Sequence, residues 1–119
     1  MNPSQSDAMD AAMKRRVTII QGPPGTGKTH TAVATLAQLA REGRGPILAT
    51  AESNVAVDNL LEGLLDLGIR AVRIGRPVKV RESLRMATLD AQIEDHPKQD
   101  ELAIVRDEMD EVQLSLIHI

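Results

Sequence analysis

Short apolar segments alternate along the chain with longer segments in which apolar residues recur at helical spacing. The short segments, at 17–20, 46–51 and 69–74, contain β-branched residues and are bounded by charge, glycine or proline, which is typical of strands buried on both faces. The helical segments between them span 28–41 and about 53–67, and each ends at glycine. This order predicts βαβ crossovers and an α/β fold with a parallel sheet.

The N-terminus carries the signals of a helix start. Asn2 suits the N-cap, Pro3 suits the first helical position, and Gln5 stands three residues after the cap, as in a capping box. A helix is therefore predicted from here to about Met13. The helix at 53–67 is apolar on nearly all sides, so we expect it to pack against more than one neighbour.

Beyond Pro77 the pattern changes to helices without intervening strands. One helix is predicted from about Arg81 to Asp95, ended by Pro97, and a second from near Lys98. The second has an apolar seam at 3-4-3-4 spacing that is too short for a stable coiled coil, so an antiparallel helical hairpin is predicted. The seam consists of Leu102, Val105, Met109, Val112 and Leu116.

These elements divide the chain into three parts. Residues 1–77 form the part with the sheet, 78–114 form the hairpin, and 115–119 are expected to be an unstructured, truncated end because no cap or closing turn follows.

Composition excludes several kinds of protein. The chain of 119 residues has no cysteine, so it holds neither a disulfide framework nor a thiolate metal site. It has no Phe, Tyr or Trp, so it cannot stack bases on such rings. It lacks a membrane-spanning apolar run and the apolar core of a signal peptide, and we therefore expect a cytoplasmic or nuclear protein.

The net charge of −3 hides a split between +4 over residues 1–89 and −7 over residues 90–119. Within the first part, a basic cluster is opposed only by Glu82. Such a cluster can attract phosphates, and it is also consistent with an ordinary solvated face. The basic cluster consists of Arg70, Arg73, Arg76, Lys79, Arg81 and Arg85.

Residues 22–29 read GPPGTGKT and match the phosphate-binding pattern G-x-x-x-x-G-K-[ST], between a predicted strand and a helix. The glycines let the backbone turn its N–H groups toward phosphates, and the helix N-terminus adds a partial positive charge. Lys28, the predicted catalytic residue, supplies charge for the β- and γ-phosphates, and Thr29 offers its hydroxyl to Mg²⁺. The predicted ATP-binding loop consists of Gly22, Pro23, Pro24, Gly25, Thr26, Gly27, Lys28, Thr29 and His30.

The loop alone does not identify the activity, because P-loop folds, AAA+ ATPases among them, host many functions. Metal or base chemistry by histidine is not predicted either, since His30, His96 and His118 are scattered along the chain.

Four motifs stand in a fixed order along the chain. They are N-x-S-Q-x-x-A at 2–8, the GPPGTGKT loop, SNVAVDNL at 53–60 and VRIGRP at 72–77. Together they resemble superfamily 1B helicases of the up-frameshift and immunoglobulin-mu-binding-protein type, over about residues 1–95. The resemblance implies part of a RecA-like P-loop NTPase domain that uses ATP and Mg²⁺ to act on single-stranded or partly duplex RNA or DNA. It also implies that the hairpin at 78–114 is the stalk-like insertion.

The resemblance assigns roles to three residues outside the loop. Gln5 corresponds to the glutamine whose amide matches the N6/N7 edge of adenine, although it also completes a capping box. Ser53 and Asn54 correspond to motif Ia, which touches the backbone of single-stranded nucleic acid in the family, and a plain helix N-cap is the alternative. Glu52 stands where the family usually has proline, and its carboxylate repels phosphate.

Later motifs of the family have no counterpart in these residues. A Walker B D-E pair, a G-D-x-x-Q motif and a second RecA-like domain are missing, so we expect a gap in the sheet and an inactive fragment. Two other functions stay open, an AAA+ ATPase that works without nucleic acid and a non-catalytic module that binds nucleotide or RNA.

Overall fold

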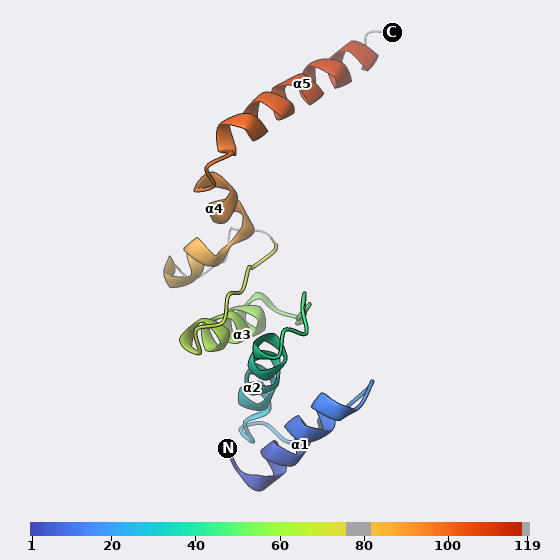
Figure 1. The fold of residues 1–119 in the computed structure, drawn as a ribbon, viewed down its shortest axis with the longest axis vertical. Helices are drawn as coiled ribbons and strands as arrows, with labels where there is room; N and C mark the ends of the chain where they lie inside the picture. Colours follow the sequence, from blue (N-terminus) through green and yellow to red (C-terminus); the bar gives the residue numbers. More distant parts are fainter. Residues whose placement is uncertain (76–81, 118–119) are drawn as a thin grey trace.

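The computed structural model describes residues 1–75 and 82–117, which form an elongated chain of helices measuring 64 × 31 × 27 Å (Figure 1). None of the helices in these residues is long and apolar enough to cross a membrane. The elements in chain order are α1 (Pro3–Lys14), α2 (Lys28–Arg41), α3 (Asn54–Asp66), η2 (Glu82–Ala87, a 3-10 helix), α4 (Leu89–Glu94) and α5 (Gln99–Ile117).

Local capping fixes the starts of α1 and α3. The predicted capping box is confirmed, because Asn2 Oδ1 accepts from the Gln5 backbone N–H at 2.9 Å and Gln5 Oε1 accepts from the Asn2 backbone N–H at 3.0 Å. Ser53 is the N-cap of α3, and its Oγ accepts from the Ala56 backbone N–H at 3.2 Å. Both helices, and α2, begin at the positions that the sequence predicts, to within one residue.

Segments 17–20, 46–51 and 69–74 are not strands in the described part of the chain. In the described residues, the β structure is limited to an isolated parallel bridge between Arg73 and Thr88. A strand is held by hydrogen bonds to a neighbouring strand, and these segments do not pair with one another. The predicted sheet is therefore not observed, and apolar side chains meant for it face solvent, with Ile19 88% and Leu48 82% exposed.

Helix α3 has neighbours on two sides, as predicted. It packs on α2 at Gly63, where a Cβ atom would lie 2.9 Å from Cγ2 of Val33, so the two helices approach closely because glycine stands there. On its other side Leu61 forms a small buried cluster with Leu84 and Ala87 of η2.

An apolar cleft of about 770 Å³ lies between these helices and two of the segments without regular structure. Its walls include Leu36 of α2 and Leu64 of α3, together with residues from 46–51 and 69–74. The helices thus turn apolar side chains toward the segments predicted as strands.

The single helix predicted over 81–95 is wrong, because η2 and α4 are separate elements that meet at Thr88. Thr88 is extended (φ −74°, ψ 148°), and its Oγ1 accepts from the Ala91 backbone N–H at 3.3 Å to cap α4. The residues on either side of Thr88 bond to the backbone of Arg73. The Arg73 N–H donates to the Ala87 carbonyl at 2.8 Å, and the Leu89 N–H donates to the Arg73 carbonyl at 2.9 Å.

The predicted antiparallel hairpin is also wrong in this structure. Helix α5 runs away from α4 rather than back along it (Figure 1). Residues 99–116 are all exposed. Because α4 has 6 residues, it is too short to cover a helix of 19 residues. The predicted unstructured end is helical through Ile117, and residues 118–119 lie outside the described residues.

Candidate nucleotide-binding loop and nucleic-acid interface

The loop from Gly22 to Thr29 leads directly into α2. Gly27 is the N-cap of α2 with φ at +81°, and Gly25 has φ at +79°, both in the left-handed region where glycine is favoured. No side chain caps α2, whereas side chains cap α1, α3 and α4. The first-turn N–H groups of α2, with Thr29 and His30 exposed beside them, are therefore free to meet an anion.

Lys28 lies folded over the loop that precedes it. Its Nζ donates to the carbonyl oxygens of Gly22 and of Pro23, the latter at 2.8 Å. The Thr26 hydroxyl donates to the same Pro23 carbonyl at 2.7 Å. The ammonium therefore lies within reach of the loop's concave backbone, bonded to neutral acceptors that phosphate oxygens would outcompete as charged ones.

Gln5 connects α1 to this loop. While its Oε1 completes the capping box, its Nε2 donates to the Thr26 carbonyl at 3.1 Å. A side-chain amide has two donor hydrogens and two acceptor lone pairs, so one of each is left after these bonds. The capping role of Gln5 is thus confirmed, and its contact with adenine stays a prediction.

We expect Gly27→Ala to destabilise the loop more than Gly25→Ala does. A Cβ atom at Gly27 would lie 2.4 Å from Nε2 of Gln5, which must swing away and lose its bond to Thr26, whereas a Cβ atom at Gly25 meets nothing within 4 Å. Both variants pay the positive-φ strain of about 1–2 kcal/mol, and Gly27→Ala adds about 1 kcal/mol for the lost hydrogen bond. Urea unfolding of both variants measures the difference.

The matched control repeats the comparison in a Gln5→Ala background, with Gly27→Ala and Gly25→Ala made separately. There the extra cost of Gly27→Ala should vanish, because no amide remains to be displaced. Equal costs for the two variants in the parent chain would show that the Gln5–Thr26 contact contributes nothing.

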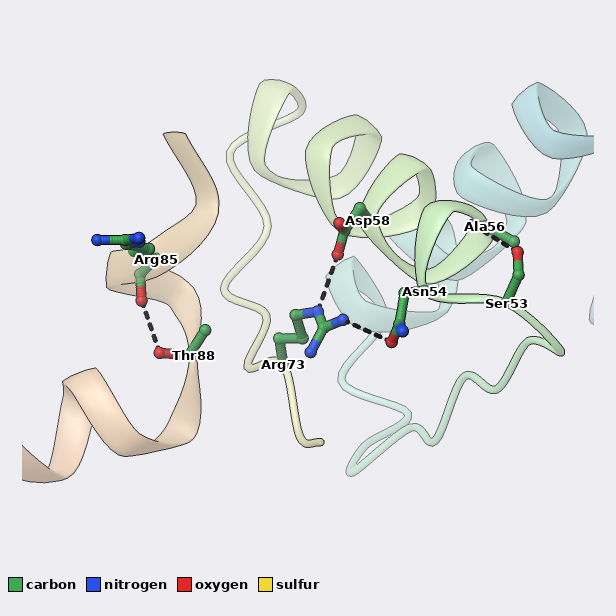
Figure 2. A network of polar contacts seen from close by, with 7 residues as sticks. All are labelled: Ser53, Asn54, Ala56, Asp58, Arg73, Arg85 and Thr88. Atoms are coloured by element: carbon green, nitrogen blue, oxygen red, sulfur yellow. Dashed lines mark hydrogen bonds and ion pairs between the residues drawn. The ribbon is translucent and has the colours of Figure 1, made fainter. Parts of the chain in front are cut away.

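Ser53 and Asn54 stand side by side at the N-terminus of α3 (Figure 2). The capping role of Ser53 is confirmed, and its hydroxyl keeps its own hydrogen for donation. Asn54 is held differently, because its Oδ1 accepts from Nη2 of Arg73 at 3.0 Å. Both residues are exposed, so both could reach a strand laid across this end of the helix.

Arg73, one of the six residues of the basic cluster, is buried. Its Nε lies 2.8 Å from Oδ1 of Asp58, and the two side chains are 2% and 3% exposed, so it is a buried ion-pair partner rather than a surface cation. Arg70 and Arg85 are exposed as expected, whereas Arg76, Lys79 and Arg81 lie outside the described residues. The pair was missed in the sequence, where the signal was a single arginine inside the apolar run 71–74.

The described residues contain no group of three or more His, Cys, Asp or Glu side chains that could hold a metal ion. His96 stabilises the turn before α5, because its Nδ1 accepts from the Lys98 backbone N–H at 3.1 Å. His118 lies outside the described residues.

Comparison with known proteins matches the chain to a family over nearly its whole length. A sequence-family model described as an AAA domain matches residues 1–117. DNA-binding protein SMUBP-2 of Mesocricetus auratus is 41% identical over 113 residues, 94% of this chain. An uncharacterized ATP-dependent helicase of Methanocaldococcus jannaschii is 36% identical over 116 residues, and ATP-dependent helicase upf1 of Schizosaccharomyces pombe is 35% identical over 125 residues, covering 95% and 96% of this chain.

The matched region is a small part of each relative. It spans 11% of the SMUBP-2 chain, 18% of the archaeal helicase and 14% of the fission-yeast helicase. The range matched by the family model, 1–117, contains the phosphate-binding loop and the motif around Ser53 and Asn54.

Proposed function

This chain belongs to the superfamily 1B helicases of the up-frameshift type, and on that premise we propose that it is the ATP-binding portion of an ATP-dependent motor that translocates along or unwinds RNA or DNA. The observation that carries the proposal is the GPPGTGKT loop at the uncapped N-terminus of α2, with Lys28 folded over it. We place this motor in the cytoplasm or the nucleus.

The loop residues fit the phosphates of ATP. Left-handed glycines turn the backbone of the loop, and the first-turn N–H groups of α2 supply donors and a partial positive charge. Lys28 exchanges its carbonyl partners for oxygens of the β- and γ-phosphates, and Thr29 would offer its hydroxyl to Mg²⁺ beside the phosphates. The remaining donor and acceptor of Gln5 match the edge of adenine, which would select ATP.

Strand binding is proposed for the N-terminus of α3. Ser53 and Asn54 are both exposed and both keep donor hydrogens, which suits contacts to phosphate or ribose oxygens. Glu52 beside them is exposed and acidic, so it weakens such contacts.

The RecA-like parallel sheet is part of the same proposal. Segments 17–20, 46–51 and 69–74 become strands of a RecA-like parallel sheet once they have neighbours, and the apolar cleft beside α2 and α3 supports this, because it turns apolar walls toward two of them. Residues 1–77 belong to that domain and 78–114 to the stalk-like insertion.

The test is ATP hydrolysis by the native protein that carries this chain, with and without single-stranded RNA or DNA. The proposal expects turnover that rises severalfold with strand, because strand contacts at Ser53 and Asn54 and nucleotide contacts at the loop belong to one domain. Full turnover without nucleic acid by a nucleotide-dependent ring would instead identify an AAA+ ATPase. Binding of nucleotide without turnover under either condition would identify a non-catalytic module.

A further inference from the structure

A buried arginine links three segments that lie far apart in the sequence. The guanidinium of Arg73 donates from Nε to Asp58 and from Nη2 to Asn54, both on α3 (Figure 2). The backbone of Arg73 bonds to Ala87 and Leu89, on either side of the η2–α4 junction. Arg73 is therefore fixed at both its side chain and its backbone.

This arrangement decides which way the Asn54 amide faces. Arginine carries only donors, so the group that Asn54 turns toward it must be the carbonyl oxygen. The Nδ2 donors of Asn54 then point away from Arg73, and the residue is exposed at the start of α3. Without the guanidinium, the amide could rotate and present an acceptor, which a phosphate oxygen cannot bond.

We propose that Arg73 is a positioning residue for strand binding. By holding the carbonyl oxygen of Asn54, it keeps the Asn54 amide donors turned toward the phosphate and ribose oxygens of a nucleic-acid strand. Asp58 fixes the guanidinium in turn, through a buried bond of 2.8 Å. This inference rests on the strand contact proposed above for Asn54.

Lysine cannot replace arginine in this role. A guanidinium is a planar fork whose separate N–H groups reach Asp58 and Asn54 at once, whereas an ammonium on a flexible stem is a point charge. Arg73→Lys therefore keeps the charge beside Asp58 while releasing Asn54, which separates charge balance from amide orientation.

The experiment measures binding of a fluorescein-labelled oligo(dT) or oligo(U) strand, by anisotropy, to the native protein that carries this chain, with thermal melting of each variant followed in parallel. Asn54→Ala and Arg73→Lys should each weaken binding about tenfold, the loss of one hydrogen bond to a charged acceptor. Combining them should weaken it no further, because both remove the same contact. Arg106→Lys, which makes the same replacement on exposed α5, is the matched control and should bind strand as the parent does.

Asn54→Asp is the second variant, and it does not depend on how well Arg73→Lys folds. Its carboxylate still offers Arg73 an oxygen, so the melting temperature should be kept. Binding should fall below that of Asn54→Ala, because the donors are lost and the new negative charge repels phosphate. In the parent chain, the Asn54 side-chain amide resonances should shift when the strand is added, while the Arg73 Nε–H resonance stays protected from exchange.

Each contrary outcome has one meaning. If both Asn54 variants bind normally, the proposed strand contact is wrong. If they bind weakly while folded Arg73→Lys binds normally, or if the losses of Arg73→Lys and Asn54→Ala add fully, the positioning role of Arg73 is wrong. An Arg73 Nε–H that exchanges freely with solvent would also overturn it.

Discussion

Lys28→Ala should abolish ATP hydrolysis by the native protein that carries this chain, with a fall in kcat of at least about a hundredfold. In the proposed site, the charge that the ammonium would bring to the β- and γ-phosphates is worth most in the transition state, where negative charge moves toward the leaving oxygen. No other Lys or Arg belongs to the loop or to the first turn of α2, so neither of these two segments supplies a second cation. Steady-state hydrolysis at saturating ATP and strand measures the effect.

The control must separate chemistry from loop structure. Lys28→Ala also removes the bonds from Nζ to the carbonyls of Gly22 and Pro23, so its melting curve is recorded beside that of the parent. Lys14→Ala removes the same side chain from the exposed last turn of α1 and should hydrolyse ATP normally. Hydrolysis by Lys28→Ala at the parent rate would contradict the assignment of the loop.

Asp58→Ala should destabilise the chain by about 3–5 kcal/mol, the typical cost of leaving one partner of a buried ion pair uncompensated. The Arg73 side chain is 2% exposed, so its charge cannot reach water without opening the contact between α3 and the η2–α4 junction. The loss is a large share of the 5–15 kcal/mol that holds an ordinary domain together. Urea denaturation, followed by helical circular dichroism, measures it.

A paired replacement tests whether the cost comes from the unpaired charge. Arg73→Met combined with Asp58→Leu puts apolar groups in the same space, and it should recover most of the stability lost in Asp58→Ala. The recovered protein should still bind strand weakly, because no guanidinium holds Asn54. If the free energy of unfolding of Asp58→Ala lies within about 0.5 kcal/mol of the parent value, the buried pair contributes no more to stability than an exposed ion pair does.

Those parts of the structure that depend on neighbouring residues were predictable from the sequence. The start of α1 follows from Asn2, Pro3 and Gln5, and that of α3 from Ser53, because a cap is a bond between residues three apart. The turn of the loop into α2 was predictable for the same reason, since its left-handed glycines stand at a fixed local spacing before Lys28, while its contact with phosphate stays a proposal.

Features that depend on distant partners were not predictable. The apolar pattern at 46–51 indicates burial, but only a neighbouring strand turns such a segment into β structure. The break at Thr88 comes from bonds to Arg73, 15 residues earlier, and no local signal marks them. The seam on α5 indicates a partner, yet it does not say which element supplies it.

In the candidate site, too, local features could be predicted from the sequence and contacts between distant residues could not. Lys28 and Ser53 are proposed as site residues from local motifs, whereas the bond from Gln5 to Thr26 spans 21 residues and the pair of Asp58 with Arg73 spans 15. Arg73 stood in a row of six basic residues, and only burial separates it from the others that the structure describes.

The exposed course of α5 has a mechanical consequence. A helix of 19 residues is about 28 Å long, so a rotation of about 10° at its base moves its far end by about 5 Å. Because α5 starts a few residues after α4, a force applied to its tip acts on α4 as through a lever arm. The first bonds to resist this force are the backbone bonds that Arg73 makes with Ala87 and Leu89, and the next is the bond from the Arg73 guanidinium to Asn54. Tension on the acidic tail of the chain is thereby delivered to the end of α3 that carries Ser53 and Asn54.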